Sequence, residues 1–254
     1  MKQRDHYRMA DEYGCLRVCQ RSISEAVMKY VRIFEDALSL VLRTPTPIVG
    51  AGRTDTGVNA RVMYAHFDTL HPIEDTQKLI NSLNRIVGKS ISIMAVLPVD
   101  SDAHARFDAV ERSYKYFVTF EKSPFLDTVS WFSPGMLDVE RMNEAAALLS
   151  DTRDFTSFAK LHSDAKTNLC DVRQAEWSDF RNPYDIPGIV FTITADRFLR
   201  NMVRAVVGTL VDVGRGKLSV SEFAAVIDKK NRCSAGTSMP PQALFLWDVK
   251  YPYI

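Results

Sequence analysis

The chain has 254 residues, of which 46% are hydrophobic and 25% are charged, a balance that excludes a disordered or fibrous protein. Its formal net charge of +1 argues against a uniformly basic RNA-coating protein, although a local cluster of Lys and Arg would still bind a polyanion. No apolar run approaches the roughly 20 residues of a membrane span, and the first residues lack the apolar core of a signal peptide. We therefore expect a cytoplasmic protein.

The first part of the chain carries little pattern. Residues 1 to about 21 are charged and show no sustained period, so the sequence predicts no element there. Ser22 and Glu25 then form a possible capping box, and apolar residues from Val27 to Leu42 fall on one helical face. Pro45 and Pro47 end this predicted helix.

A glycine-rich loop with one carboxylate follows. Residues 52–59 read Gly-Arg-Thr-Asp-Thr-Gly-Val-Asn and lie between a short apolar run at 48–51 and a strand-like run at 62–67. Asp55 therefore lies on a connection between two buried elements, where a rigid scaffold commonly presents a reactive group. The alternative is an Asx-turn, in which Asp55 bonds only to its own backbone and Gly57 supplies the positive φ.

Strands and helices alternate through the rest of the chain. A polar segment at 102–107 is the predicted link between two halves, and the strand at 113–118 places Tyr114 and Tyr116 on one face. Asp138 and Ser219 are the predicted caps of two helices. The other predicted elements are a helix at 76–87, strands at 91–96, 173–179, 189–194 and 244–249, and an apolar helix at 198–213. Because this order lacks the regularity of a doubly wound sheet, we expect an α+β fold with largely antiparallel sheets.

Arg204 is a charge inside the most apolar predicted helix. A buried guanidinium is costly unless it is paired, so an acidic group should face it. The alternative is an arginine at the helix edge, with a packed stem and a guanidinium in water.

Two motifs resemble the tRNA pseudouridine synthase A family. They are Gly-Arg-Thr-Asp-x-Gly-Val-x-Ala at 52–60 and Phe-x-x-x-Met-Val-Arg-x-x-Val-Gly at 198–208, and the resemblance extends from about Ala37 to the carboxyl terminus. It implies a pseudouridine synthase fold of two α+β domains, each a largely antiparallel sheet flanked by helices, with the active-site cleft between them. We expect domain boundaries of 1–107, carrying the Asp loop, and 108–254.

The resemblance also implies roles for individual residues. Asp55 matches the catalytic aspartate, Arg204 matches the arginine that pairs with it, and Tyr114 matches the tyrosine that stacks on the target base; by pattern alone, Tyr114 would be a core aromatic. Arg106 is expected to contact the RNA backbone, and Arg53 a phosphate or a displaced base. Tyr116 is expected in the core, and His104 and His66 in structural positions.

The chain departs from the family pattern in several places. Asn59 replaces the usual His of the Asp motif, and Ala103 replaces the first Phe of a Phe-His-Ala-Arg-Phe motif. Residues 1–33 are atypical, without the family's opening strand or its Gly-Trp-Gln. The codons for residues 8–11, read one base later, can encode Gly-Trp-Gln, so we hold a frameshift as a hypothesis that an intact reading frame in homologous strains would refute.

We therefore predict an isomerase that converts uridine to pseudouridine in the tRNA anticodon stem-loop, at nucleotides 38 to 40, acting as a homodimer. No metal or organic cofactor is implied, and the four cysteines are not spaced as a zinc site or a disulfide framework. One alternative is a catalytically impaired tRNA-binding or tRNA-folding protein of the same family. Another is a hydrolase of a glycosidic bond, although such enzymes usually need a second carboxylate.

Overall fold

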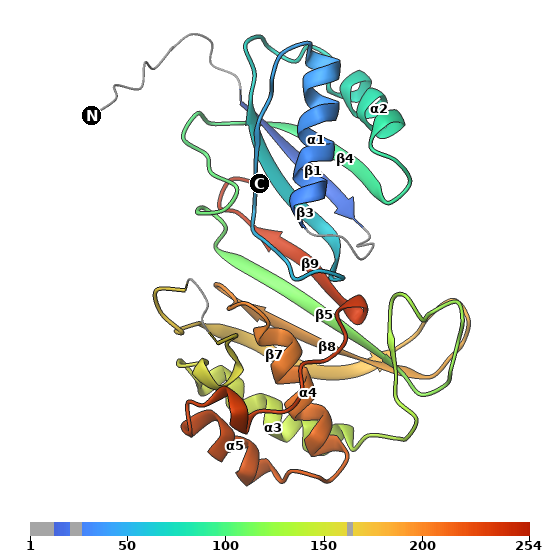
Figure 1. Ribbon diagram of the computed structural model, residues 1–254, viewed down its shortest axis with the longest axis vertical. Coiled ribbons are helices and arrows are strands. Elements are labelled where there is room, and N and C mark those ends of the chain that lie inside the picture. The colour runs from blue at the N-terminus through green and yellow to red at the C-terminus, as the bar shows by residue number, and fades with distance from the viewer. Residues whose placement is uncertain (1–12, 21–26, 162–164) are drawn as a thin grey trace. The chain divides into compact units, whose positions relative to one another are not determined.

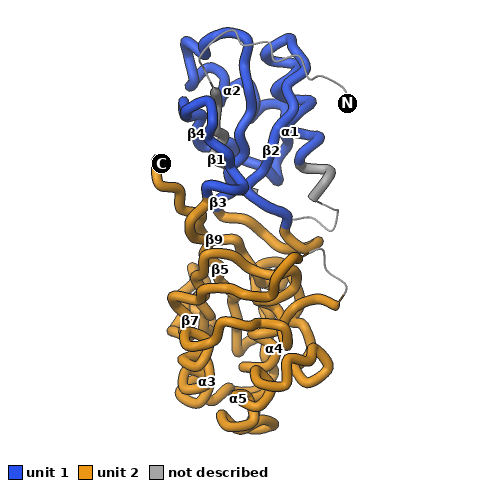
Figure 2. Tube along the Cα trace, turned by 90° about the vertical axis from the view of Figure 1, so that its left-hand side faces the viewer, with its two compact units in different colours: residues 1–20, 27–53, 62–108 blue, residues 21–26, 54–61, 109–254 orange. Residues whose placement is uncertain are grey.

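The computed structural model describes residues 13–20, 27–161 and 165–254, and side chains from residue 31 onward. Backbone contacts divide these residues into two compact units, coloured separately in Figure 2. The first contains residues 13–20, 27–53 and 62–108, and the second contains residues 54–61, 109–161 and 165–254. The loop of Asp55 thus belongs to the second unit. The domain boundary at residues 107 and 108, and a cleft between two domains, stay predictions.

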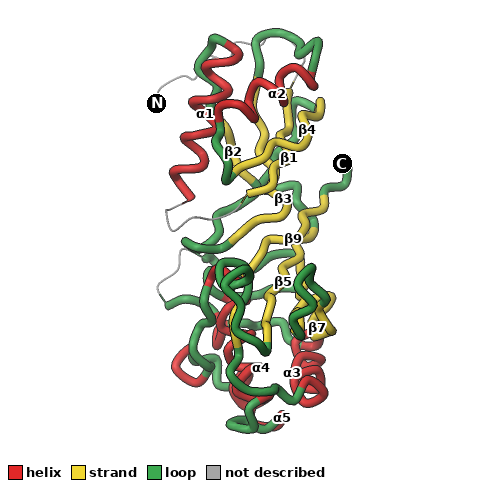
Figure 3. The backbone as a smooth tube through the Cα atoms, turned by 90° about the vertical axis from the view of Figure 1, so that its right-hand side faces the viewer, coloured by secondary structure: helices red, strands yellow, loops and turns green. Residues whose placement is uncertain are grey.

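The first unit combines a small sheet with two helices (Figures 1 and 3). Its elements in chain order are β1 (Tyr13–Gln20), α1 (Val27–Leu42), β2 (Ile48–Gly50), β3 (Asn59–Asp68), α2 (Thr76–Ile86) and β4 (Ile91–Val99). Strand β1 lies between β4 and β3, and β2 pairs with the C-terminal part of β3. The helices pack on each other and on the sheet, burying Phe34, Leu38, Phe67, Leu83 and Ile93.

Strand β1 corrects the expectation that the atypical first residues carry no strand. It pairs antiparallel with β4, and a bulge between Arg17 and Val18 shifts the register. Because a bulge interrupts the alternation of side chains, the local sequence hides this strand, and only its distant partner β4 reveals it. Helix α1 confirms the predicted helix before Pro45, but Ser22, Glu25 and residues 8–11 lie outside the described residues.

The second unit is a larger sheet with its helices packed on one another (Figure 1). Its strands follow the order β9-β5-β8-β7, with the first residues of β3 on β9 and with β6 on β5. The β3–β9 and β5–β6 pairs are parallel, and the other pairs are antiparallel. The elements are β5 (Glu111–Thr119), β6 (Trp131–Phe132), α3 (Val139–Asp151), β7 (Val172–Phe180), β8 (Gly188–Ala195), α4 (Met202–Gly214), α5 (Val220–Asp228) and β9 (Leu244–Lys250).

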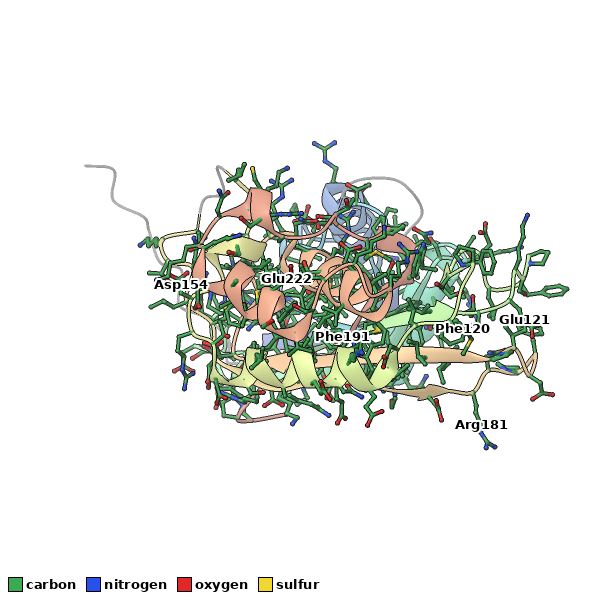
Figure 4. The ribbon with its side chains drawn as sticks, turned by 90° about the horizontal axis from the view of Figure 1, so that it is seen from below. Phe120, Glu121, Asp154, Arg181, Phe191 and Glu222 are labelled. Carbon is green, nitrogen blue, oxygen red and sulfur yellow. The ribbon has the colours of Figure 1, made fainter. Side chains whose placement is uncertain are left out.

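The main core lies between this sheet and helices α3, α4 and α5. Tyr116, Phe191 and Trp177 point into it from three neighbouring strands, and Phe191 is fully buried. Figure 4 shows Phe191 in this interior, with Glu121 and Arg181 at one end of the sheet and Asp154 at the other. The burial of Tyr116 confirms its predicted place in the core. None of the helices in the described part of the chain is long and apolar enough to cross a membrane.

The predicted caps are present, but one helix begins later than expected. Asp138 accepts a hydrogen bond from the Arg141 amide at the start of α3, and Ser219 forms a capping box at the start of α5. Helix α4 begins at Met202, four residues after the predicted start at residue 198, because Asn201 has a left-handed φ of 65°. A left-handed residue cannot belong to a right-handed helix, and apolar periodicity does not reveal it.

Candidate active site

Asp55 and Arg204 form an ion pair within the second unit. Arg204 Nη1 donates to Asp55 Oδ2 at 3.2 Å, and the two side chains are 18% and 19% exposed. The pair joins residues 149 positions apart, so it is a product of the fold and not of local sequence. The predicted acidic partner of Arg204 is therefore Asp55, and the Asp55 carboxylate is largely shielded from water.

Arg204 is held at both its side chain and its backbone. Its Nε donates to the Met239 carbonyl oxygen at 2.6 Å, and its own carbonyl accepts a hydrogen bond from the Met239 amide at 3.1 Å. The guanidinium thus contacts the carboxylate through one nitrogen and is oriented through another. A planar guanidinium fixed in this way presents its charge in one direction, which an ammonium on a flexible stem does not do.

Residues 239–242, which we call the bracket, contact several segments that carry the site. Met239 accepts from Arg204, and the Pro240 carbonyl accepts from the Tyr116 hydroxyl at 3.1 Å. Pro241 lies against Gly57, and the Gln242 carbonyl accepts from Asn59 Nδ2 at 2.7 Å. These four successive residues therefore contact helix α4, strand β5 and the second half of the turn that begins at Asp55.

Gly57 permits the close approach of that turn to the bracket. Its φ is +88°, and a Cβ added there would lie 2.7 Å from Pro241 Cγ. The Val58 amide donates to the Asp55 carbonyl at 3.1 Å and closes the turn, and Val58 is buried in the core. The turn confirms the positive φ expected at Gly57, while Asp55 directs its carboxylate to Arg204.

Replacing Gly57 by Ala is expected to damage both stability and activity. The left-handed backbone costs about 1–3 kcal/mol of unfolding free energy for a residue with a side chain, and the clash with Pro241 displaces the turn. We expect activity to fall about 10- to 100-fold, because small misplacements of a reacting group are costly. Thermal unfolding and initial rates measure the two effects. Gly52→Ala is the control, since its φ is not positive and its added Cβ meets nothing within 4 Å; an unchanged Gly57→Ala protein would contradict this account.

Tyr114 lies on β5 near the ion pair. Its ring packs edge-on against Phe198, with ring centroids 5.0 Å apart, and the residue is half-buried. Burial raises the pKa of the Tyr114 hydroxyl to about 12, and the negative charge of Asp55 contributes to this rise. The phenol is therefore neutral at physiological pH and is an electrostatic neighbour of the carboxylate.

Comparison with known proteins places this chain in a family. A model of the tRNA pseudouridine synthase family matches residues 145–252. The tRNA pseudouridine synthase A of Parabacteroides distasonis is 55% identical over 218 residues, which cover 86% of this chain and 84% of that protein. The chain belongs to the tRNA pseudouridine synthase A family. Family members from Bacteroides fragilis and Bacteroides thetaiotaomicron are 51% and 52% identical over 231 residues, covering 91% of this chain and 87% and 82% of those proteins.

Two residues of the predicted site belong to the first unit. Arg53 has an exposed side chain. Arg106 is also exposed, with its guanidinium carbon 5.7 Å from the centre of the Phe107 ring. Their contacts with RNA stay predictions, as does the role of Tyr114 toward a base.

The two histidines near Arg106 are structural, as expected. His104 Nδ1 accepts from the amides of Arg106 and Phe107, and His66 Nδ1 accepts from the Ala105 amide at 3.0 Å. Burial lowers the pKa of His66, and the nearby His104 lowers it further. Both rings therefore hold the backbone around Arg106 through their Nδ1 atoms.

The substitution of Asn59 for the histidine usual in the tRNA pseudouridine synthase A family also has a structural explanation. Asn59 is 1% exposed, and its amide bonds to the bracket. Position 59 thus supports the turn after Asp55 by joining it to the bracket.

Sequence reasoning missed one residue at the carboxylate. Arg200 Nε lies 3.8 Å from Asp55 Oδ1, and its side chain is 63% exposed. The sequence did offer one indication of Arg200: it lies four residues before Arg204, so two cations occur near the start of one helix. The two oxygens of Asp55 therefore face different arginines, one fixed and largely buried, the other exposed.

Proposed function

We infer that this chain converts uridine to pseudouridine in tRNA, at nucleotides 38 to 40 of the anticodon stem-loop. The observation that supports this most strongly is the Asp55–Arg204 ion pair, with Tyr114 as its neighbour, in a member of this family. A carboxylate held by a fixed cation is a suitable nucleophile for covalent chemistry on a nucleoside.

The reaction is an isomerisation that needs no other reactant. The bond between C1′ and N1 breaks, the uracil turns, and a bond forms between C1′ and C5. C5 then loses its hydrogen as a proton, and N1 gains a proton. Asp55 attacks either C6 of the base or C1′ of the sugar, and Arg204 keeps the carboxylate oriented in both cases. The uridine must first leave the base stack, because its reacting atoms are inaccessible within a helix.

Tyr114 is proposed to stack on the displaced uracil. Its ring projects from strand β5, and an aromatic face on a rigid strand can stack on a base that has left the helix. Tyr114→Phe should keep activity within about threefold, whereas Tyr114→Ala should lower kcat/KM about 10- to 100-fold, the range expected from one lost base–aromatic contact. Steady-state rates on a tRNA transcript measure both. Tyr184→Ala is a control, because Tyr184 is 51% exposed and stacks on Phe125; equal loss in the Phe and Ala variants of Tyr114 would contradict stacking.

We also propose that the protein acts as a homodimer in the cytoplasm, where tRNA is modified. Light scattering should then give a particle of two chains of 28.7 kDa. A single-chain mass at working concentration would refute the dimer.

Position mapping tests the proposed substrate. An unmodified tRNA transcript is incubated with the protein, and pseudouridine is located by a carbodiimide adduct that stops reverse transcription. We expect stops that report nucleotides 38 to 40 and none when these uridines are replaced by cytidine. Release of free uracil would support a hydrolase, and binding without any product would support the non-catalytic tRNA-binding alternative.

A further inference from the structure

The Arg200 side chain is more exposed than that of Arg204 and is held by fewer contacts. Arg204 is 18% exposed and bonded at two nitrogens, whereas Arg200 is 63% exposed and lies 3.8 Å from Asp55 Oδ1. The backbone of Arg200 is nevertheless fixed, because its carbonyl accepts a hydrogen bond from the Lys160 amide at 3.0 Å. Arg200 is thus a long, exposed cation that is anchored at its base beside the carboxylate.

The arrangement at the carboxylate leaves one oxygen for reaction. Oδ2 is engaged by the fixed Arg204, so Oδ1 is the oxygen that can approach a nucleoside. In the free protein, the Arg200 guanidinium lies near Oδ1 and would hinder that approach. The Arg200 guanidinium is 63% exposed and lies 3.8 Å from Oδ1, so it gains little from this contact and opening the contact is inexpensive. A guanidinium released in this way can bind phosphate through two parallel hydrogen bonds.

We propose that Arg200 exchanges partners when tRNA binds, leaving Asp55 Oδ1 and taking a phosphate beside the target uridine. This inference rests on the proposed function, because it assumes that Asp55 acts on a nucleotide of RNA. Arg200 is then a substrate-binding residue whose departure exposes the reactive oxygen. Phosphate contacts of this kind set position and register without reading sequence.

The test is Arg200→Gln, measured by rate and by salt-dependent binding of an unmodified tRNA transcript. Loss of one charge-assisted contact should raise KM about tenfold and leave kcat within about twofold. The plot of log binding constant against log salt should become shallower by about 0.7 to 0.9. Arg200→Lys keeps the charge and should restore the slope, while recovering KM only in part because a lysine binds phosphate as a point charge.

Arg141→Gln is the matched control. Arg141 is 64% exposed and pairs with Asp138 at 3.4 Å, so it resembles Arg200 in exposure and in having a carboxylate partner. We expect wild-type KM and salt slope for this variant. A wild-type KM and salt slope in Arg200→Gln would overturn the proposal. A fall in kcat alone would also overturn it, because it would show that Arg200 acts only on Asp55 and not on the RNA. If the wild-type protein forms no pseudouridine, the proposed function fails, while the salt slope still decides whether Arg200 contacts RNA.

Discussion

Replacing Asp55 by Asn is expected to abolish pseudouridine formation while leaving tRNA binding intact. Asn has nearly the same shape and can still accept a hydrogen bond from Arg204 at 3.2 Å, so the turn and helix α4 should keep their positions. Without a charged oxygen there is no nucleophile, and we expect the rate to fall about 10⁴-fold or more, as for other essential nucleophiles. Single-turnover rates with saturating protein measure the chemical step directly.

Binding distinguishes this loss from a damaged fold. Removing one negative charge from a surface that meets phosphates should leave tRNA affinity within about threefold of the wild type. Asp179→Asn is the control, because Asp179 is an exposed carboxylate on β7. An Asp55→Asn protein that forms pseudouridine at a rate near the wild type would remove Asp55 from the proposed chemistry.

Replacing Arg204 should have the second-largest effect, acting on both activity and stability. Arg204→Gln leaves Asp55 without its fixed cation and the Met239 carbonyl without its donor. We expect kcat to fall about 10²- to 10³-fold, the loss typical of one electrostatic contact in a water-poor site. The free energy of unfolding should fall by about 2–3 kcal/mol, less than for a fully buried pair because both side chains keep some exposure.

A lysine variant separates charge from geometry at this position. Arg204→Lys keeps the charge but cannot supply two nitrogens at fixed angles, so it should recover stability more than kcat. Arg215→Gln serves as the control, since Arg215 is an exposed residue that caps the other end of α4. Equal kcat in Arg204→Gln and the wild type would show that Arg204 is only a structural partner.

The sequence predicted those features that depend on local pattern or on a single strong physical demand. Helix α2 and the caps at Asp138 and Ser219 follow from periodicity and side-chain chemistry, which act over a few residues. The need of Arg204 for an acidic partner follows from the cost of burying a charge, and Asp55 meets it.

The features that were missed depend on distant partners or on backbone atoms. Strand β1 contains a bulge and is recognised only by its pairing with β4, and the later start of α4 depends on the left-handed Asn201. The bracket acts largely through the carbonyls of Met239, Pro240 and Gln242, and carbonyls are the same in every residue. Arg200 was visible as a charge, but its place at Asp55 Oδ1 required the folded loop.

Release of tritium tests the central claim most directly. The purified chain is incubated with a tRNA transcript that carries tritium at C5 of uracil, and tritium in water is counted beside the Asp55→Asn variant. Because the new bond to C5 replaces that hydrogen, our account predicts release by the wild type at the rate of product formation and none by the variant. Tight tRNA binding without release by the wild type, or equal release by both proteins, would contradict it.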